Sequence, residues 1–450
     1  MEKLISVVLI LCVMCMLISA MATESPGLPE IRITLANGVT IDQINSGSKD
    51  TKYPGNFVEI QEAEGKDFSG YDDVELKGRG NFTWECGNKK PYQLKFDTKI
   101  SILGMPKAKK WILIANYADV TLMRNKLAFD LALQMGFPAP ESHWVDLYVN
   151  DSYLGNYLLC EKNEIGKGRV ELKDDYGVLC EVDGNYGTKE DYYFTTAVNG
   201  NVIVLSDSVA DDLGEENAKS ELAFFMFQNK INAFEELLYS DTATWNEIAA
   251  LIDVDSFIKY YFLQELCENS DGCYSSLYLY SDGVDDVIHL GPAWDFDIAF
   301  GQFNCDERGG NPTIDYTSNI ITYQSKDSVD WFNRLLHHEE FNDLAILMYN
   351  EEIKPIFMGI PQMVADYMAE ENFMVSVNRN FERWDKLLGH KSVYGQDAHS
   401  YASTYESEVQ YMLDWIRDRL QYMNDRYKTG SKFYHYQPIE SVQRDSFSAA

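Results

Sequence analysis

One stretch of the sequence constrains the fold most strongly, because it places acidic side chains on both sides of a predicted β-hairpin. Residues 271–301 read DGCYSSLYLYSDGVDDVIHLGPAWDFDIAFG. Two short apolar runs in this stretch are separated by the turn-forming Ser281-Asp282-Gly283, which predicts two antiparallel strands. A hairpin returns the chain to its starting point, so we expect Asp271 to lie close to Asp295 and Asp297.

Acidic side chains on loops at one end of a hairpin suit a divalent cation and a phosphate-bearing substrate. Protein kinases arrange their catalytic loop, a hairpin and an Asp-Phe-Gly segment in this order. The alternative is that Asp295 and Asp297 only cap a turn, since short motifs also arise by chance.

Residues 1–22 have the pattern of a signal peptide. Lys3 supplies a positive charge, Leu4 to Ala20 is an uncharged apolar run, and Ala20-Met21-Ala22 fits a cleavage site. The alternative is an uncleaved membrane anchor, for which the run is near the lower length limit. No later stretch is apolar enough to span a bilayer. We therefore expect a secreted or extracytoplasmic protein with no stable membrane insertion after signal cleavage.

The net charge of -33 argues against binding to nucleic acid or to anionic lipid as the main role. An acidic protein that handles a nucleotide must gather its few positive charges where the phosphates lie. Beyond the leader the chain has an even number of cysteines, which allows disulfides in an exported protein. No C-x-x-C pair occurs among them, which disfavours a structural zinc site. They are Cys86, Cys160, Cys180, Cys267, Cys273 and Cys305.

The pattern along the chain predicts an α+β protein with an atypical, protein-kinase-like two-lobed fold. Residues 23–160 form mostly short alternating runs, which predict a β-rich N-lobe with one helix over 121–135. Residues 161–427 change to longer amphipathic segments, which predict a mainly helical C-lobe after a hinge near Glu161. Residues 428–450 have little apolar content and are expected to form a flexible tail.

The positive charges needed for a nucleotide occur in the predicted N-lobe. Lys77-Gly78-Arg79-Gly80-Asn81 combines two bases with glycines that let the backbone approach a phosphate, although the same composition suits an ordinary exposed loop. Lys95 lies on an alternating predicted strand and faces either a cleft or water. Arg124 opens the predicted helix and either binds phosphate or is an ordinary solvated residue.

Four longer segments combine these residues in a fixed order. They read KGRGNFTWECGNKKPYQLKF, LGMPKAKKWILIANYADVTLMRNKLAFDLA, LYVNDSYLGNYLLCEK and GPAWDFDIAFG. Together they resemble the CotH kinase family, a group of atypical protein kinases named for a spore-coat protein H. The similarity runs from about Leu28 to about Tyr427.

The resemblance implies transfer of the ATP γ-phosphate to Ser or Thr of a protein substrate, with Mg²⁺ or Mn²⁺. By match to the family's motifs, Arg79 and Lys95 would hold the nucleotide phosphates, Arg124 would support that basic corner, and Glu161 would border the adenine. Asp271 would accept the proton of the substrate hydroxyl. Asp295 or Asp297 would bind the metal, and the sequence leaves open which of the two does so.

One departure from conventional kinases affects the metal site. Their catalytic loop carries an Asn five residues after the catalytic Asp, where this chain has Ser276, a poorer cation ligand. The main alternative function is therefore a catalytically silent relative that acts as a structural or binding protein at a cell or spore surface. A third possibility is a phosphotransferase that acts on a non-protein substrate.

Overall fold

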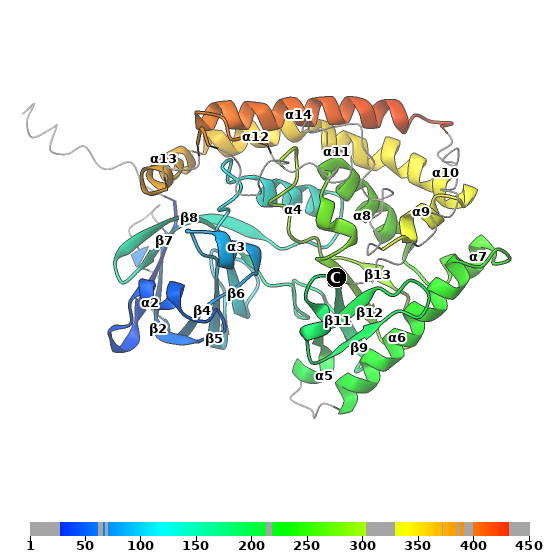
Figure 1. The fold of residues 1–450 in the computed structure, drawn as a ribbon, viewed down its shortest axis with the longest axis horizontal. Helices are drawn as coiled ribbons and strands as arrows, with labels where there is room; N and C mark the ends of the chain where they lie inside the picture. The colour runs from blue at the N-terminus through cyan, green and yellow to red at the C-terminus, as the bar shows by residue number, and fades with distance from the viewer. Residues whose placement is uncertain are drawn as a thin grey trace, which may run out of the picture.

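The computed structural model describes residues 28–61, 66–67, 71–212, 218–302, 329–370, 372–384, 388–390 and 399–431. The predicted signal peptide and most of the predicted tail lie outside these ranges. The described chain is a mixed α+β protein with a β-rich N-terminal part and helices in its C-terminal part, as predicted (Figure 1). Within the described residues, no helix is both long and apolar enough to cross a membrane.

The N-terminal part is built on a sheet that closes into a barrel. Its strand order is β1-β7-β8-β6-β5-β4-β2-β3, and β1 also pairs with β2, which closes the ring. The strands are β1 (Glu30–Leu35), β2 (Tyr53–Gln61), β3 (Lys66–Asp67), β4 (Tyr71–Gly78), β5 (Tyr92–Ile100), β6 (Ala108–Ile114), β7 (Ser142–Val149) and β8 (Ser152–Glu161). Two short helices, α2 (Ile41–Ser46) and α3 (Phe82–Cys86), lie in the connections. The predicted β-rich lobe, expected to contain one helix over 121–135, thus also contains α2, which Thr40 and Gln43 begin with a capping box.

Alternation along the strands decides which side chains fill the barrel. On β5, Tyr92, Leu94 and Phe96 point inward and are buried, whereas Gln93 and Lys95 point outward. The β7–β8 hairpin turns at Asn150-Asp151, both in the left-handed conformation that these residue types tolerate. The barrel therefore has its own apolar core, separate from the larger core of the helices.

The C-terminal part contains a second sheet of five strands, ordered β10-β11-β9-β12-β13. Its strands are β9 (Gly177–Val182), β10 (Tyr193–Thr195), β11 (Val202–Ser208), β12 (Leu277–Asp282) and β13 (His289–Leu290). The predicted hairpin is confirmed, since Tyr280 of β12 lies opposite His289 of β13. The description of this part as mainly helical was incomplete. Strand β11 was not predicted, although the turn-forming Asn199-Gly200 precedes it. It pairs with β10 across this turn and with β9 on its other side.

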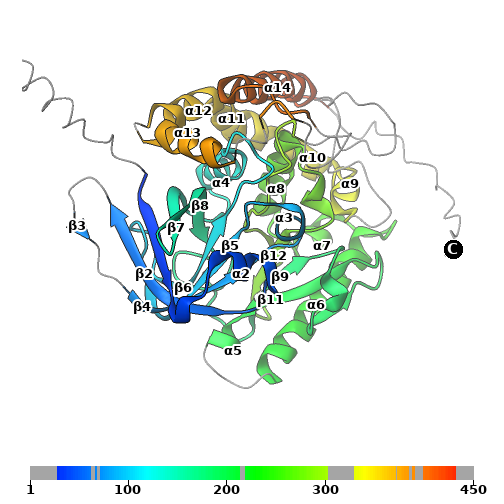
Figure 2. The ribbon, with the colours of Figure 1, turned by 60° about the vertical axis from the view of Figure 1, so that its left-hand side comes forward.

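Helices cover the second sheet and bridge it to the barrel. They are α4 (Arg124–Gln134), α5 (Val209–Asp212), α6 (Ala218–Leu238), α7 (Trp245–Ala249), α8 (Val254–Cys267), α9 (Trp331–Leu335), α10 (Glu339–Met348), α11 (Lys354–Met358), α12 (Ile360–Ala369), α13 (Phe373–Arg383) and α14 (Tyr405–Arg426). The long α14 lies over α8 and α11, and α6 packs against β9 and β11 (Figures 1 and 2). Although α4 precedes β7 in the sequence, it packs on α8, α11 and α12.

A polar contact fastens the barrel to α13. The side chain of Asn156 on β8 donates to Ser376 Oγ at 3.0 Å, and its backbone N–H donates to Asn380 Oδ1 at 3.1 Å. The neighbouring Gly155 has φ of 125°, and a Cβ there would meet Asn380 Oδ1 at 2.7 Å. Only glycine therefore allows this approach of strand and helix.

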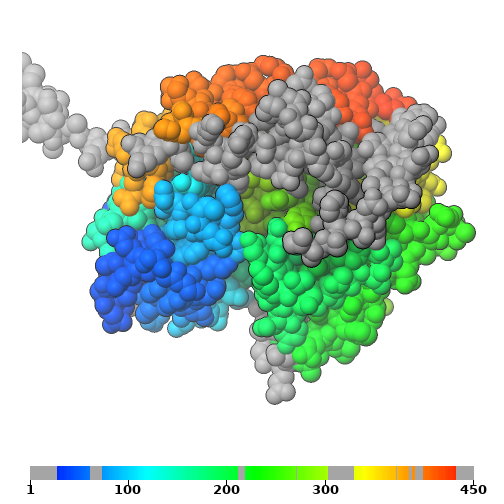
Figure 3. All heavy atoms as spheres, in the orientation of Figure 1, coloured from blue at the N-terminus to red at the C-terminus, as the bar shows by residue number. Residues whose placement is uncertain are grey.

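On one face of the molecule the barrel and the second sheet with α6 lie side by side (Figure 3).

Cys86, Cys160, Cys180 and Cys267 are free thiols. These four residues thus form none of the disulfides that the even cysteine count allows. Burial raises the pKa of the Cys160 thiol to about 12, so it is neutral and unreactive at ordinary pH. Cys305 lies outside the described residues.

Candidate active site

The loop that carries Asp271 begins where α8 ends. Glu268 adopts a left-handed conformation, and residues Ser270–Cys273 then form one short 3₁₀ turn. Gly272 presses this turn onto α8, since a Cβ there would lie 2.5 Å from Gln264 Oε1. The Tyr260 hydroxyl donates to the carbonyl of Gly272. The position of Asp271 is therefore set by the buried helix beneath it.

A single side chain links this loop to the segment after the hairpin. Asn269 is buried, its Oδ1 accepts the backbone N–H of Asp271 at 3.4 Å, and its Nδ2 donates to the Asp295 carbonyl at 2.9 Å. The structure thus brings together the two acidic segments that the hairpin was expected to bring together.

Two helices, α4 and α8, hold the segment that carries Asp295 and Asp297 through hydrogen bonds to its backbone. The Phe296 N–H donates to Asn125 Oδ1 of α4 at 2.8 Å, and the Phe300 N–H donates to the Cys267 carbonyl at 2.8 Å. Asp295 has φ of 63°, an uncommon conformation for a residue other than glycine. Burial raises the pKa of Asp295, and the charge of Arg79 and a hydrogen bond with Asp297 partly offset this effect.

Arg79 supplies positive charge to this corner from the end of β4. Its guanidinium lies over the Trp294 ring at 5.0 Å from the centroid. Within the described ranges, no carboxylate comes within ion-pair distance of it, although it lies near enough to Asp295 to influence its pKa. Its charge is therefore available to an anion beside Asp295.

Further bases line the outer face of the barrel in two rows. In one row Lys77 lies opposite Gln93, and in the next Lys95 lies between Glu75 and Lys110. Of the two alternatives for Lys95, the structure favours water, since its side chain is 40% exposed and that of Lys77 is 28% exposed. Lys77 and Lys95 point to the same face of the sheet, because Lys95 pairs with Glu75, which lies two residues before Lys77 on β4. Burial lowers the pKa of Lys77, the charge of Asp50 at 3.9 Å opposes this effect, and the positive charges of neighbouring bases add to it.

Arg124 has a different environment from the one expected. Its side chain is fully buried, with Nη1 at 2.5 Å from Asp119 Oδ1 and Nη2 at 3.6 Å from Glu408 Oε1. Its Nε donates to the Ala299 carbonyl at 2.9 Å. Although burial opposes its charge, the two carboxylates raise the pKa of Arg124. The reading of Arg124 as a solvated helix residue is therefore wrong, and its charge is neutralised inside the protein.

Glu161 ends β8 and is buried. Its Oε2 accepts the Glu141 N–H at 3.0 Å, and its Oε1 lies 3.4 Å from Arg169 Nε. Burial raises the pKa of Glu161. It lines a cavity of about 310 Å³ together with Phe137, Pro138 and other residues of the connection between the barrel and the second sheet.

Ser276 lies between the 3₁₀ turn and β12 and has a left-handed φ of 59°. Its neighbour Ser275 donates to Asp183 Oδ1 at 3.3 Å. This contact places the end of β9 beside the loop of Asp271.

Three residues of this corner were missed in the sequence: Glu181, Asp183 and Tyr278. Glu181 of β9 lies directly opposite Tyr278 of β12 and shares a hydrogen bond with it. The pKa of Glu181 is raised to about 7, chiefly by burial and also by the charges of Asp183 and Asp295, while Tyr278 and Arg79 act in the opposite direction. The alternating acids in Glu181-Val182-Asp183 at the end of a predicted strand were the available signal.

The described residues contain no group of three or more His, Cys, Asp and Glu side chains that could hold a metal ion alone. A metal bound between Asp295 and Asp297 would need further ligands. In kinases, phosphate oxygens of the nucleotide fill that part of the coordination shell. The donor set therefore fits a metal that arrives with a nucleotide.

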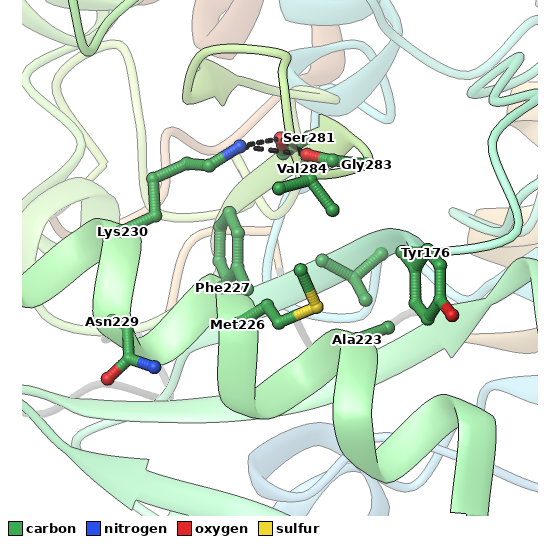
Figure 4. Close-up of a pocket in the computed structure, with 10 residues that line it drawn as sticks. Tyr176, Ala223, Met226, Phe227, Asn229, Lys230, Ser281, Gly283 and Val284 are labelled. Atoms are coloured by element: carbon green, nitrogen blue, oxygen red, sulfur yellow. Dashed lines mark hydrogen bonds between the residues drawn. The ribbon is translucent and has the colours of Figure 1, made fainter.

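A separate apolar cavity of about 290 Å³ lies between α6 and the second sheet, with Met226, Phe227 and Val284 on its walls (Figure 4). Lys230 at its rim donates to Ser281 Oγ at 2.7 Å and to the Gly283 carbonyl at 2.9 Å. None of the acids described above lines it, so this cavity is distinct from the candidate active site.

Comparison with known proteins assigns the chain to a family. Residues 76–423, more than half of the chain, match the family described as CotH kinase protein. The chain belongs to this family, and the resemblance read from its sequence motifs is confirmed.

Two individual proteins are similar to the chain. Inner spore coat protein H of Bacillus subtilis (strain 168) is 23% identical over 364 residues, which cover 78% of this chain and 87% of that protein. The crystal structure of a Helicobacter pylori proinflammatory kinase, CtkA, aligns over 89% of this chain and 98% of that chain with 8% identity. Its TM-score is 0.27, so this likeness carries no argument about fold or mechanism.

Proposed function

We propose that this chain is an ATP-dependent protein kinase that phosphorylates Ser or Thr of extracellular, surface or coat proteins. The observation that carries the proposal is the link through Asn269. It holds the loop of Asp271 against Asp295, beside the unneutralised Arg79, in a member of the CotH kinase family. The barrel and the helical part then correspond to the two lobes of an atypical kinase fold.

In this proposal the acids and bases have separate roles. The substrate hydroxyl oxygen attacks the γ-phosphorus, the bond from that phosphorus to the bridging oxygen breaks, and the hydroxyl proton passes to the carboxylate of Asp271. Arg79 neutralises the phosphate charge that develops beside Asp295. Asp295 and Asp297 would hold Mg²⁺ or Mn²⁺, which neutralises and orients the phosphates when bound.

The remaining expected site residues support the nucleotide to different degrees. Lys77 and Lys95 are both on the outer face of the barrel and both suit phosphate contact. Glu161 lines the cavity at the connection, where an adenine would lie in a kinase. Arg124 instead positions the segment of Asp297 through its bond to the Ala299 carbonyl. Glu181 and Asp183 add negative charge that favours a cation.

The alternative is a catalytically silent protein of a cell or spore surface. Ser276 favours it, because a hydroxyl replaces the amide that conventional kinases use as a second metal ligand. The name of the Bacillus subtilis relative describes a spore coat protein and is compatible with either function. The signal-peptide pattern supports export in both cases.

Transfer of labelled phosphate tests the proposal. Residues 23–450 would be incubated with γ-labelled ATP, Mg²⁺ or Mn²⁺, and a serine-rich protein acceptor. We expect acid-stable label on serine or threonine with the unaltered protein and with the control Asp285→Asn, whose exposed side chain lies on the hairpin turn. The variant Asp271→Asn should transfer little label. The same loss of label in Asp271→Asn and Asp285→Asn, or no transfer by the unaltered protein, would favour the silent alternative.

A further inference from the structure

A basic cavity lies beside the connection between barrel and second sheet. Its volume is about 610 Å³, and its walls are residues 99–110 of the barrel and the loop 164–171. Six basic side chains line it, against two acidic ones, in a protein whose net charge is -33. The bases are Lys99, Lys107, Lys109, Lys110, Lys167 and Arg169. It is therefore a local exception to the charge of the whole molecule.

The cavity is a fixed part of the fold. Gly168 has φ of 77°, and a Cβ there would lie 2.5 Å from Pro106 Cγ, so the loop can approach the barrel this closely only with glycine. Arg169 holds the two walls together, because it donates to the carbonyls of Lys110 at 3.3 Å and Lys162 at 3.2 Å. Its guanidinium also packs on the Trp111 ring at 5.2 Å.

Most of the positive charge is not used internally. Arg169 is paired with Glu161 and Glu164, and Lys110 lies 3.9 Å from Glu164. The other four lysines, Lys99, Lys107, Lys109 and Lys167, are exposed, and no ion pair to them occurs in the part of the chain that the structure describes. Several unpaired ammonium groups around one concavity favour a ligand with several negative charges.

The loop is also held by a hydrogen bond of its own. The Gly168 N–H donates to a carboxylate oxygen of Glu171 at 2.7 Å, which satisfies this backbone donor within the wall. The candidate catalytic and metal residues, among them Asp271, Asp295 and Arg79, do not line the cavity. Its charges are therefore separate from those beside Asp295.

We propose that this cavity docks phosphorylated segments of the protein substrate, which the active site has already modified. This inference rests on the proposed kinase function and specifies the substrate class. Each phosphoserine adds roughly -1.5 to -2 charges at neutral pH. The acidic protein repels such a segment over most of its surface, whereas the lysines of the cavity attract it. Docking holds a partly phosphorylated chain while further serines reach Asp271.

Binding of a synthetic phosphopeptide to residues 23–450 tests the proposal without requiring catalysis. The probe is a fluorescein-labelled, serine-rich peptide with three phosphoserines, followed by fluorescence anisotropy at two salt concentrations. The variant is Lys107→Gln/Lys109→Gln/Lys167→Gln. The control is Lys189→Gln/Lys219→Gln/Lys428→Gln, which removes equal charge outside the cavity. Circular dichroism would verify the folding of both.

We expect the first variant to bind the phosphopeptide at least tenfold more weakly and the control to stay within twofold of the unaltered protein. The unphosphorylated peptide should bind at least tenfold more weakly than the phosphopeptide. Millimolar inorganic phosphate should not displace the phosphopeptide. Equal binding by both triple variants would overturn the proposal. Full displacement by ATP would also overturn it, since the cavity would then belong to the nucleotide site.

The result of the phosphopeptide-binding test can be distinguished from the result of the kinase test. Asp271→Asn should bind the phosphopeptide as tightly as the unaltered protein, because Asp271 does not line the cavity. Docking without phosphate transfer by the unaltered protein would refute the kinase and leave a phosphopeptide-binding surface. Transfer without docking would refute only the inference.

Discussion

Two regions of the molecule gather charged side chains, and they balance these charges differently. Around Arg124 one guanidinium meets two carboxylates, Asp119 and Glu408, and all three side chains are fully buried. Around Asp295 a single Arg79 influences both Asp295 and Glu181, and Asp183 adds a further negative charge beside Glu181. In the first region the guanidinium has two carboxylate partners within the protein, and these contacts join α4 to α14. The second has surplus negative charge, which is the condition for taking up a cation and its nucleotide.

The largest expected effect is on catalysis. Asp271→Asn keeps the size of the side chain but removes its ability to accept a proton, so we expect the rate of phosphate transfer to fall by about 10² to 10⁴. The melting temperature should stay close to that of the unaltered protein, because the turn is held by backbone contacts to Tyr260 and Asn269. Near-normal autophosphorylation by this variant would remove Asp271 from the mechanism.

The next effect tests the region around Arg124. Arg124→Met leaves the buried carboxylates of Asp119 and Glu408 without the guanidinium, with His399 still 3.0 Å from Glu408, so we expect the free energy of unfolding to fall by about 3–5 kcal/mol. Urea denaturation would measure it.

Arg79→Met is the matched change in the other region. It removes a guanidinium that makes a cation–π contact and no ion pair among the described carboxylates, so the loss of stability should be only about 1 kcal/mol. ATP affinity should fall instead. Equal destabilisation by the two variants would mean that both regions are structural.

The raised pKa of Glu181 predicts that the free energy of unfolding depends on pH. In the folded protein this carboxyl keeps its proton up to a pH of about 7, whereas an unfolded glutamate loses it near 4.5. The folded state therefore binds more protons in this window, and the contribution of Glu181 to the free energy of unfolding decreases as pH rises through it. Glu181→Gln should remove that decrease.

Cation binding should show the opposite trend, since ionised Glu181 attracts Mn²⁺. We expect Mn²⁺·ATP affinity to rise between pH 6 and 8 in the unaltered protein and in the control Glu190→Gln, whose side chain is exposed. The rise should be smaller in Glu181→Gln. The same pH profile in all three proteins would exclude Glu181 from the site.

The smallest effect concerns the two lysines of the barrel face. Lys77→Met and Lys95→Met each remove one partly exposed charge, so we expect ATP affinity to fall by only about 5-fold for either. Lys77 should have at least as large an effect as Lys95, because it is less exposed and lies nearer to Arg79. Isothermal titration with Mg²⁺·ATP would compare them, and a much larger loss in Lys95→Met would contradict the register described here.

The sequence predicted the parts of the site that depend on local structure. The turn and the two apolar runs of the β12–β13 hairpin are local signals, and they place Asp271 near Asp295 before any tertiary contact is known. The environment of Arg124 could not be predicted, because Glu408 comes 284 residues later and reaches it only through the packing of α14. The neighbours of Glu181 are also brought together only by strand pairing, since Tyr278 lies almost a hundred residues away.

The unbalanced acidic corner can be tested most directly by measuring how far a divalent cation tightens nucleotide binding. Titrations of ATP with and without Mn²⁺ would be compared for the unaltered protein, Asp295→Ala, Asp297→Ala and the control Asp285→Asn. We expect Mn²⁺ to strengthen ATP binding at least tenfold in the unaltered protein and the control, and to have little effect in Asp295→Ala or Asp297→Ala. The same Mn²⁺ dependence in all four proteins would contradict the account.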